Sequence, residues 1–283
     1  MLHEFQGRFP AIILAILAVA GFQFPLCGGA EETLKIAGVG SALGSMQLLG
    51  AAFVKSHRDI KVVVVPGLGT SGGIKAVWKD AIGIGLAARP LTEEERGLGL
   101  VSTEYARSPF VFVVRQDVRI SDLRTGDIAR ILRGEVPTWP SGERIRLVLR
   151  PEYDTDTHIV KRISPEMQEA LERALSREGM SIAMTDQEAA EWVRRTPGAF
   201  GFSTLTQIIS EGLPLKVLSY NGVVPSVRTL ADGSYPLFKS ASIVTKGEPS
   251  DTVRRFISFV RSEKGMAILE QSGNLVIGPE AKR

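Results

Sequence analysis

The segment from residue 62 to residue 77, VVVVPGLGTSGGIKAV, constrains the fold of this chain more than any other. Its four valines indicate a buried strand, the glycines predict a turn over 67–73, and a helix is expected from about Ile74. The turn carries two hydroxyl side chains, Thr70 and Ser71. Backbone N–H groups at a helix start, the positive end of the helix dipole and these hydroxyls together predict an anion site.

A second unit made of a strand, a Gly/Ser-rich turn and a helix precedes this segment. A short strand is expected over 34–37, and the sequence GVGSALGS, residues 38–45, leads into an apolar helix over 46–54. Two such units in tandem are typical of an α/β protein that binds its ligand at helix N-termini. The sequence therefore predicts that both turns lie at one edge of a sheet.

Composition places the chain among globular proteins with a large core. It has 283 residues, of which 44% are hydrophobic and 23% are charged, and this is enough for one large core or two lobes. The formal net charge of +3 is only mildly basic, and the sequence has no Lys/Arg-rich run with interleaved aromatic residues. A nucleic-acid partner is therefore not expected.

The first thirty residues have the pattern of an export signal. Arg8 precedes an apolar stretch over 9–24, and small residues precede a cleavage point before Glu31. Prolines and a glutamine keep this stretch shorter than the roughly 20 apolar residues that a spanning helix needs. Cleavage predicts a periplasmic or extracytoplasmic chain without Cys27, the only cysteine, and so without disulfides or thiol chemistry. A lipid anchor at Cys27 is disfavoured because the bulky Leu26 precedes it.

Strand and helix signals alternate along the rest of the chain. Residues 34–91 show the order βαβαβ, which includes a strand over 81–87, and an apolar strand is expected over 110–114. Beyond that strand, the patterns predict helices over 121–132, 157–163, 165–174, 185–194 and 265–271, a helix capped by Ser250, and strands over 144–149, 200–202, 215–218 and 242–245.

Two patterns bear on cofactors and metals, and neither supports one. GLGTSG, residues 67–72, matches the GxGxxG pattern of dinucleotide sites, which need an acidic residue about 20 positions further on. Residues 86–89 read LAAR and offer no acid. The three histidines, His3, His57 and His158, show no metal-ligand spacing. We therefore expect no cofactor and no metal.

GTSGG, residues 69–73, also matches the GxSxG pattern, which would make Ser71 a nucleophile. A hydrolase would place an acid and a histidine later in the chain, and Asp154, Asp156 and His158 do follow. However, a proline and a glycine loosen the sharp strand-to-helix turn of a nucleophile elbow, and the candidate acid and base are only two residues apart. An exported serine hydrolase that uses Ser71 remains an alternative hypothesis.

The run RPEYDTDT, residues 150–157, follows one predicted strand and precedes a predicted helix. One interpretation is an ordinary helix cap by Thr155 or Asp156. The other is a third ligand loop, in which hydroxyls, backbone N–H groups and Arg150 bind an oxyanion. The similarity of its position to the first two loops favours a ligand loop. Arg89, at the end of another predicted strand, is expected at the same edge.

A series of motifs occurs in a fixed order along the chain. They are GS at 40–41, GxGTSGGIKAV, GxAARPLT, DIARILRGEVPTW, RPxxDTDT, TPGAFGF and the C-terminal block from IVTKGEP to GNLV. Each motif is weak by itself, but the ordered set, over about 34–277, resembles the phosphate-type periplasmic solute-binding proteins. These proteins are the substrate-capturing subunits of ABC importers.

The resemblance implies a particular fold and a set of site residues. The expected fold is α/β, two-lobed and periplasmic-binding-protein-like (type II), with a mixed sheet flanked by helices in each lobe and the ligand in the cleft between them. One lobe would comprise 31–114 and 221–283 and the other 115–220, with hinges near Val114 and Tyr220. The expected ligand-binding residues are Ser41, Gly44, Ser45, Thr70, Ser71, Arg89, Arg150, Asp154, Thr155 and Thr157.

Two departures from the family pattern leave the ligand open. The family has an aspartate at the end of the third strand that accepts a proton from bound phosphate, whereas this chain has Ala88 followed by Arg89. The third loop, usually Ser-Gly-Thr-like, carries Asp154 and Asp156 instead. Loss of the acceptor and the gain of Arg89 favour a fully deprotonated anion. One alternative is that Asp154 or Asp156 restores the acceptor from the opposite lobe, but two acids facing the cleft would repel a dianion.

The function that the resemblance implies is capture rather than catalysis. The lobes would close on phosphate or a related small oxyanion, and the closed monomer would dock on the membrane permease of an ABC importer. A sensor or scavenger protein for a different small polar solute is the remaining alternative.

Overall fold

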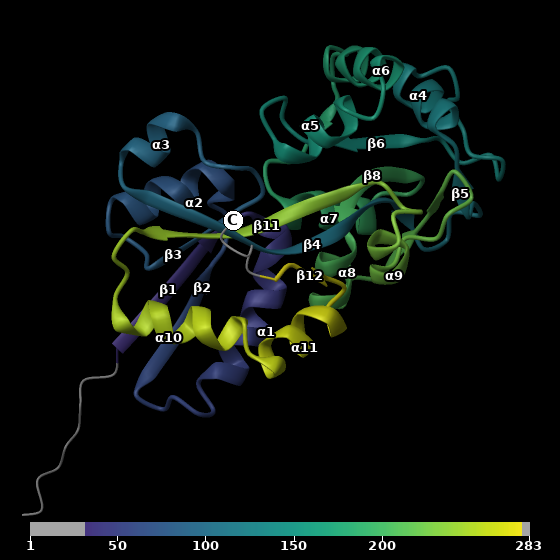
Figure 1. Ribbon diagram of the computed structural model, residues 1–283. Coiled ribbons are helices and arrows are strands. Elements are labelled where there is room, and N and C mark those ends of the chain that lie inside the picture. Colours follow the sequence, from purple (N-terminus) through teal and green to yellow (C-terminus); the bar gives the residue numbers. More distant parts are fainter. Residues whose placement is uncertain (1–31, 279–283) are drawn as a thin grey trace, which may run out of the picture. The chain divides into compact units, whose positions relative to one another are not determined.

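The structure, a computed structural model, describes residues 32–278 (Figure 1). The predicted signal segment, residues 1–30, and Cys27 lie outside the described residues. Between residues 32 and 278, no helix is both long enough and apolar enough to cross a membrane.

Most strands of the described segment belong to one mixed sheet. The strands of the described segment are β1 (Glu32–Gly38), β2 (Ile60–Val65), β3 (Ile84–Ala87), β4 (Leu100–Arg115), β5 (Asp122–Leu123), β6 (Arg146–Leu149), β7 (Ser181–Ile182), β8 (Ala199–Thr204), β9 (Leu215–Val217), β10 (Ser219–Tyr220), β11 (Phe238–Lys246) and β12 (Leu275–Val276). The sheet order is β2-β1-β3-β11-β4-β8-β6-β7, and β9 and β12 also pair with β4. The short strands β5 and β10 pair with each other.

The helices pack on both faces of this sheet (Figure 1). They are the 3₁₀ helix η1 (Gly40–Ala42) and α1 (Leu43–Phe53), α2 (Gly69–Trp78), α3 (Glu93–Gly97), α4 (Thr125–Arg133), α5 (Thr155–Lys161), α6 (Pro165–Leu175), α7 (Asp186–Arg195), α8 (Leu205–Ser210), α9 (Val227–Ala231), α10 (Asp251–Val260) and α11 (Glu263–Gln271). Ser250 caps α10 as expected, because its side chain accepts a hydrogen bond from the backbone N–H of Val253.

The N-terminal βαβαβ order is confirmed. Strands β2, β1 and β3 are parallel neighbours, so the loops that follow them meet at one edge of the sheet. Side chains alternate between the faces as strand geometry requires. Leu34 and Ile36 of β1 pack with α1, α10 and α11, whereas Ala87 of β3 packs with Ile74 and Val77 of α2 on the other face.

The long strand β4 serves two parts of the sheet. Its residues 100–109 pair with β11, and its residues 110–114 pair with β8. In the second part, Phe110 and Phe112 face a core shared with α4, α5 and α6, while Val111 and Val113 face α7. The expected strand over 110–114 is therefore the second part of a strand that begins ten residues earlier.

Gly73 sets the distance between α2 and β1. A Cβ atom at Gly73 would lie 2.7 Å from the Cα of Gly38 and 2.9 Å from the carbonyl oxygen of Ala37. We expect Gly73→Ala to lower the free energy of unfolding by about 1–3 kcal/mol, because α2 must move off the sheet. At the neighbouring Gly72, a Cβ would meet only the Leu68 side chain, at 3.3 Å.

Gly72→Ala is the matched control for this prediction. It adds the same methyl group to the same helix turn, where alanine is the better helix former by about 1 kcal/mol. Urea denaturation of both variants compares them directly. Equal effects of the two substitutions would contradict the packing argument.

Candidate functional site

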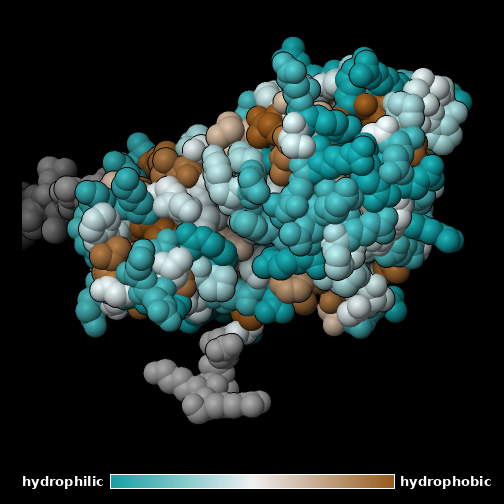
Figure 2. Space-filling model, turned by 90° about the horizontal axis from the view of Figure 1, so that it is seen from above, coloured by the Kyte–Doolittle hydropathy of each residue, from teal (hydrophilic) through white to brown (hydrophobic). Residues whose placement is uncertain are grey.

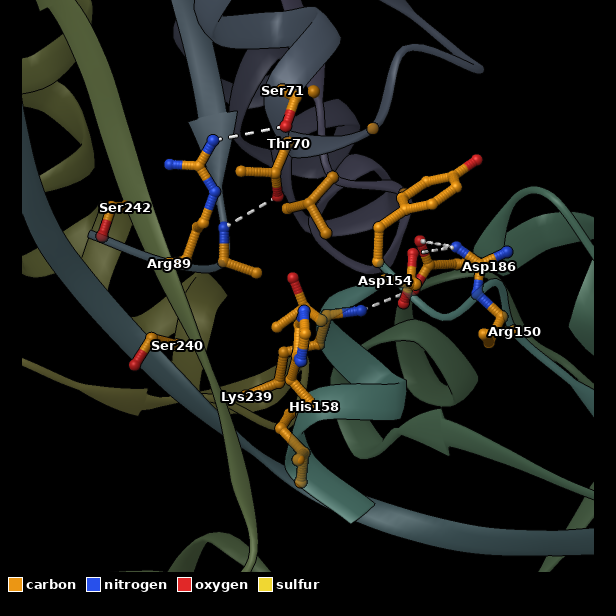
Figure 3. A pocket seen from close by; sticks show the side chains of 18 of the residues that line it. Thr70, Ser71, Arg89, Arg150, Asp154, His158, Asp186, Lys239, Ser240 and Ser242 are labelled. Carbon is orange, nitrogen blue, oxygen red and sulfur yellow. Dashed lines mark hydrogen bonds and ion pairs between the residues drawn. The ribbon is translucent and has the colours of Figure 1, made fainter. Parts of the chain in front are cut away.

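A cavity of about 1520 Å³ lies at the edge where the N-terminal parallel strands end. Its walls come from both parts of the sheet: the loops after β1, β2 and β3, the strands β4 and β11, and the N-terminal ends of α5 and α7. In Figure 3, Thr70, Ser71 and Arg89 lie on one side of the cavity and Arg150, Asp154 and Asp186 on the other. The cavity is therefore bounded by polar groups from segments that are distant in the sequence.

The start of α2 forms one wall. This helix begins at Gly69, so the prediction of a start near Ile74 is wrong, and Thr70 and Ser71 lie in its first turn. The Thr70 hydroxyl accepts a hydrogen bond from the backbone N–H of Ala88 at 3.1 Å, and the Ser71 hydroxyl accepts one from Arg89 at 3.2 Å. Each hydroxyl keeps its own proton to donate. This wall offers a ligand hydroxyl donors and the positive end of a helix dipole.

Arg89 is held in place by a carboxylate. Both terminal nitrogens of its guanidinium donate to Glu95, each at 2.8 Å. Glu95 also belongs to the capping box that starts α3 with Thr92. Hydrogen bonds from Arg89 hold the pKa of Glu95 below its usual range. Arg89 therefore places hydrogen-bond donors on this wall, while Glu95 balances much of its charge.

In the third loop, Asp154, which we expected to contact the ligand, caps helix α5. The Asp154 side chain accepts a hydrogen bond from the backbone N–H of Asp156 at 2.9 Å, and α5 begins at Thr155. Neither Thr155 nor Asp156 is the cap, so that interpretation is corrected. Thr157 is buried, and its hydroxyl donates to the Pro151 carbonyl at 2.9 Å. The Thr157 hydroxyl therefore stabilises the conformation of the loop.

Arg150 is buried in a network of protein acceptors. One terminal nitrogen donates to the Ala183 carbonyl and the other to Asp154, each at 2.7 Å. Asp186 lies 3.7 Å from the guanidinium and Asp156 lies 4.0 Å from it. Arg150 is thus surrounded by three carboxylates, where the sequence analysis expected an arginine ready to bind an oxyanion.

Lys239, on β11, completes this cluster. Its Nζ lies 2.5 Å from an Asp156 oxygen and 2.8 Å from an Asp186 oxygen, and all three side chains are at most 6% exposed. We call Arg150, Asp154, Asp156, Asp186 and Lys239 the buried charge cluster. It contains two cations and three carboxylates, so its net charge is −1 when all five groups are ionised.

The cluster shifts the pKa values of its members in opposite directions. Burial raises the pKa of Asp156 to about 6, and the nearby Asp186 carboxylate adds to this shift, while Lys239 opposes it. Burial acts on Asp186 in the same direction, but Lys239 and Arg150 outweigh it and lower the pKa of Asp186. A proton on Asp156 would make the cluster electrically neutral.

Sequence reasoning missed Asp186 and Lys239. Asp186 is the first residue of α7, a helix that the sequence pattern did predict, and nothing in its local pattern distinguishes it from an ordinary N-terminal acid. Lys239 lies in the part of β11 before the predicted strand at 242–245, and it is 3% exposed. Its position opposite Ser108 of β4 comes from strand pairing that is distant in sequence.

The first loop lies mostly behind the cavity. Gly38, Val39 and Gly40 line the cavity, but Ser41, Gly44 and Ser45 are buried and do not. The Ser45 hydroxyl donates to the Ala42 carbonyl at 3.0 Å. A Cβ at Gly44 would overlap the Ser210 hydroxyl of α8. As ligand contacts, these three residues stay predictions.

The residues of the hydrolase alternative do not form a triad in this structure. Within the described residues, the hydrogen-bond partner of the Ser71 hydroxyl is the cation Arg89, which cannot act as a base. Asp156, a candidate acid, is engaged with Lys239. No cluster of three or more His, Asp or Glu side chains in residues 32–278 is arranged to hold a metal ion.

A mixed sheet with two sets of cores, and a cavity lined from both parts of that sheet, defines a two-lobed solute-binding protein fold. Comparison with known proteins gives the family. Residues 28–264 match the model of the PBP superfamily domain. The chain belongs to the PBP superfamily, and the predicted fold class is confirmed.

Individual relatives and solved structures agree with this assignment. The chain is 24% identical to a phosphate-binding protein PstS of Borreliella burgdorferi, over 87% of this chain and 92% of that protein. It is 25% identical to the PstS of Bacillus subtilis, over 89% of each. A structure described as a phosphate ABC transporter substrate-binding protein of Clostridium perfringens, solved with bound phosphate, superposes with a TM-score of 0.73. The two chains are 20% identical, and the alignment covers 87% of this chain and 100% of the Clostridium perfringens chain.

Proposed function

We propose that this protein is an extracytoplasmic solute-binding protein that captures phosphate or a related oxyanion-bearing solute for an ABC importer. The observation that carries this proposal is the wall at the start of α2. There the Thr70 and Ser71 hydroxyls, the helix N-terminus and Arg89 converge on one side of a cavity within a PBP superfamily fold. The names of its relatives, phosphate-binding proteins, support the same class of ligand.

Capture would proceed by closure of two lobes. Two separate core groups support two lobes, and the chain passes from one to the other between Pro109 and Phe110 and between Leu237 and Phe238. The first crossing lies 4 residues before the expected hinge at Val114, whereas the second lies 17 residues after the hinge expected at Tyr220. At this crossing the Phe110 N–H donates to the Leu237 carbonyl at 3.0 Å. Ligand contacts made only in the closed form would shift the population toward closure.

The proposed partner of the closed form is a membrane permease, and we propose that the protein works as a monomer. Figure 2 shows one face of the structure, on which hydrophobic residues form scattered patches separated by hydrophilic ones. Monomeric proteins rarely expose large contiguous apolar patches, so this face fits the proposal. The export signal predicted for residues 1–30 supports a location outside the cytoplasm.

A thermal-shift assay with oxyanions tests the proposal. A ligand bound only by the native state, at about 100 times its dissociation constant, adds about 2.7 kcal/mol to stability and raises the melting temperature. Ser71→Ala should weaken oxyanion binding about tenfold or more, because one hydrogen bond to a charged group is lost. Ser71 is exposed, so the fold should tolerate this change.

Ser176→Ala is the control, since Ser176 is an exposed serine at the end of α6 and does not line the cavity. It should leave the oxyanion response unchanged. If no oxyanion or oxyanion-bearing solute raised the melting temperature of the unsubstituted protein, the proposed function would be wrong.

A further inference from the structure

The buried charge cluster has no positive charge left for a ligand. Its two cations, Arg150 and Lys239, are balanced by Asp154, Asp156 and Asp186 at distances from 2.5 to 4.0 Å. A doubly charged anion in contact with either cation would bring the net charge of this shielded region from −1 to −3. Uncompensated charge in a buried region is strongly unfavourable.

The wall at the start of α2, across the cavity from the cluster, can stabilise a ligand with a single negative charge. The N-terminus of α2 contributes about half a positive charge, and Thr70 and Ser71 contribute neutral donors. Arg89 already shares its charge with Glu95. At the mouth of the cavity, the exposed Arg162 on the turn after α5 adds a positive charge that would attract an anion from solution.

Exposed hydrophobic side chains gather around the same cavity. Of the ten large hydrophobic side chains that are exposed within the described residues, five line it. They are Leu68, Val101, Tyr153, Met184 and Phe238. A bare inorganic oxyanion has no apolar surface to bury against them. An organic body would bury such surface.

The cavity has room for a ligand larger than an inorganic ion. Its volume of about 1520 Å³ exceeds the range of about 300–1,000 Å³ that is usual for sites of drug-sized ligands. Closure of the lobes would reduce this volume and bring the apolar side chains closer to a ligand.

We propose that the cleft selects an organic solute with a singly charged oxyanion group, and that Asp156 and Asp186 exclude doubly charged inorganic anions from Arg150 and Lys239. The acid group would bind at the Thr70, Ser71 and Arg89 wall, and the organic body would contact the apolar side chains. This inference rests on the proposed function, because it names the kind of oxyanion that the same cleft would take.

Calorimetric titration at pH 7.5 with four probes separates charge from apolar contact. Sulfate and phosphate carry most or all of a double charge, methanesulfonate carries one charge on a body of similar size, and benzenesulfonate adds an aromatic ring. We expect methanesulfonate to bind at least about tenfold more tightly than sulfate, because of the cluster's net negative charge. Phosphate should lie between them, because part of it is singly charged at this pH. Benzenesulfonate should bind about tenfold more tightly still, because it buries apolar surface.

Three variants show which residues cause these differences in affinity. Tyr153 is 74% exposed, so Tyr153→Ala should leave the fold intact and weaken benzenesulfonate several-fold without changing methanesulfonate. The double variant Asp156→Asn/Asp186→Asn leaves the cluster with a net charge of +1. It should bind phosphate and sulfate at least about tenfold more tightly than the unsubstituted protein does. The single variant Asp156→Asn, with a neutral cluster, should gain part of this affinity.

Each outcome decides a different point. Sulfate binding as tightly as methanesulfonate to the unsubstituted protein would overturn the inference while leaving the proposed function standing. If none of the four probes bound and the wider thermal-shift panel also failed, the proposed function would fall together with it. If the double variant did not fold, the order of the four probes on the unsubstituted protein and the Asp156→Asn variant would still decide.

Discussion

Replacing Lys239 with methionine is expected to lower the free energy of unfolding by about 3–5 kcal/mol. Methionine can fill much of the volume of the lysine stem, so the main loss is the charge. Asp156 and Asp186, at 2.5 and 2.8 Å from Nζ, would remain buried without their nearest cation. The cluster would then hold three carboxylates and Arg150 alone, with a net charge of −2. Urea denaturation at pH 7.5 measures the effect.

The same strand provides the control. Lys246 lies near the end of β11 and pairs with Asp80, also at 2.5 Å, but both side chains are well exposed. Lys246→Met should change the free energy of unfolding by less than about 1 kcal/mol, because water screens exposed pairs. If the two substitutions lowered the free energy of unfolding by similar amounts, the claim that burial makes the ion pairs of Lys239 more important for stability would be wrong.

Acidification from pH 6 to pH 4 is expected to stabilise the protein through Asp156, by up to about 3 kcal/mol. Burial raises the pKa of Asp156 to about 6, from an ordinary value of 3.8. Between these values the native state binds a proton that the unfolded chain does not bind. Stability therefore falls as the pH rises through this window and is constant above it.

The titration of Asp186 has the opposite effect on stability, and it occurs below pH 4 rather than between pH 4 and pH 6. Its pKa is lowered by Lys239 and Arg150, so its contribution is present above about pH 4 and is lost only as the pH falls further. Asp156→Asn removes the Asp156 titration and leaves Asp186 in place. From pH 4 to pH 6 the unsubstituted protein should lose the stability that protonated Asp156 gives it, whereas the variant has no such loss. The difference between their free energies of unfolding should therefore change over this range. A constant difference would contradict the assignment.

The parts of the fold that depend on local patterns were predictable from the sequence. The strand at Val62–Val65 and the cap at Ser250 are each specified within about ten residues and form as expected, although the four valines are half-buried rather than buried. The GVGSALGS segment is a turn only in its first part, because α1 begins at Leu43 and not near residue 46. The exact start of α2 was not predictable, because glycines favour turns in general. The close approach of Gly73 to Gly38 leaves no room for a Cβ, so a glycine is required where α2 packs on the sheet.

The candidate site was predictable only in part. Thr70, Ser71, Arg89, Arg150, Asp154 and Thr155 all line the cavity, as their positions at strand ends and helix starts imply. The distant partners of Arg150 were not predictable, because the Ala183 carbonyl and Asp186 come from 33 and 36 positions later in the chain. Lys239 joins the same cluster from a strand 89 positions after Arg150. Whether an arginine is available to a ligand depends on such distant partners, and no local pattern contains them.

Capture without catalysis is tested by a calorimetric titration of the protein with oxyanion-bearing solutes, with each solute examined by NMR afterwards. We expect one solute molecule to bind per protein and to be recovered unchanged. Consumption of a solute would contradict capture without catalysis. The absence of binding by any oxyanion-bearing solute would contradict the assignment of the cleft itself.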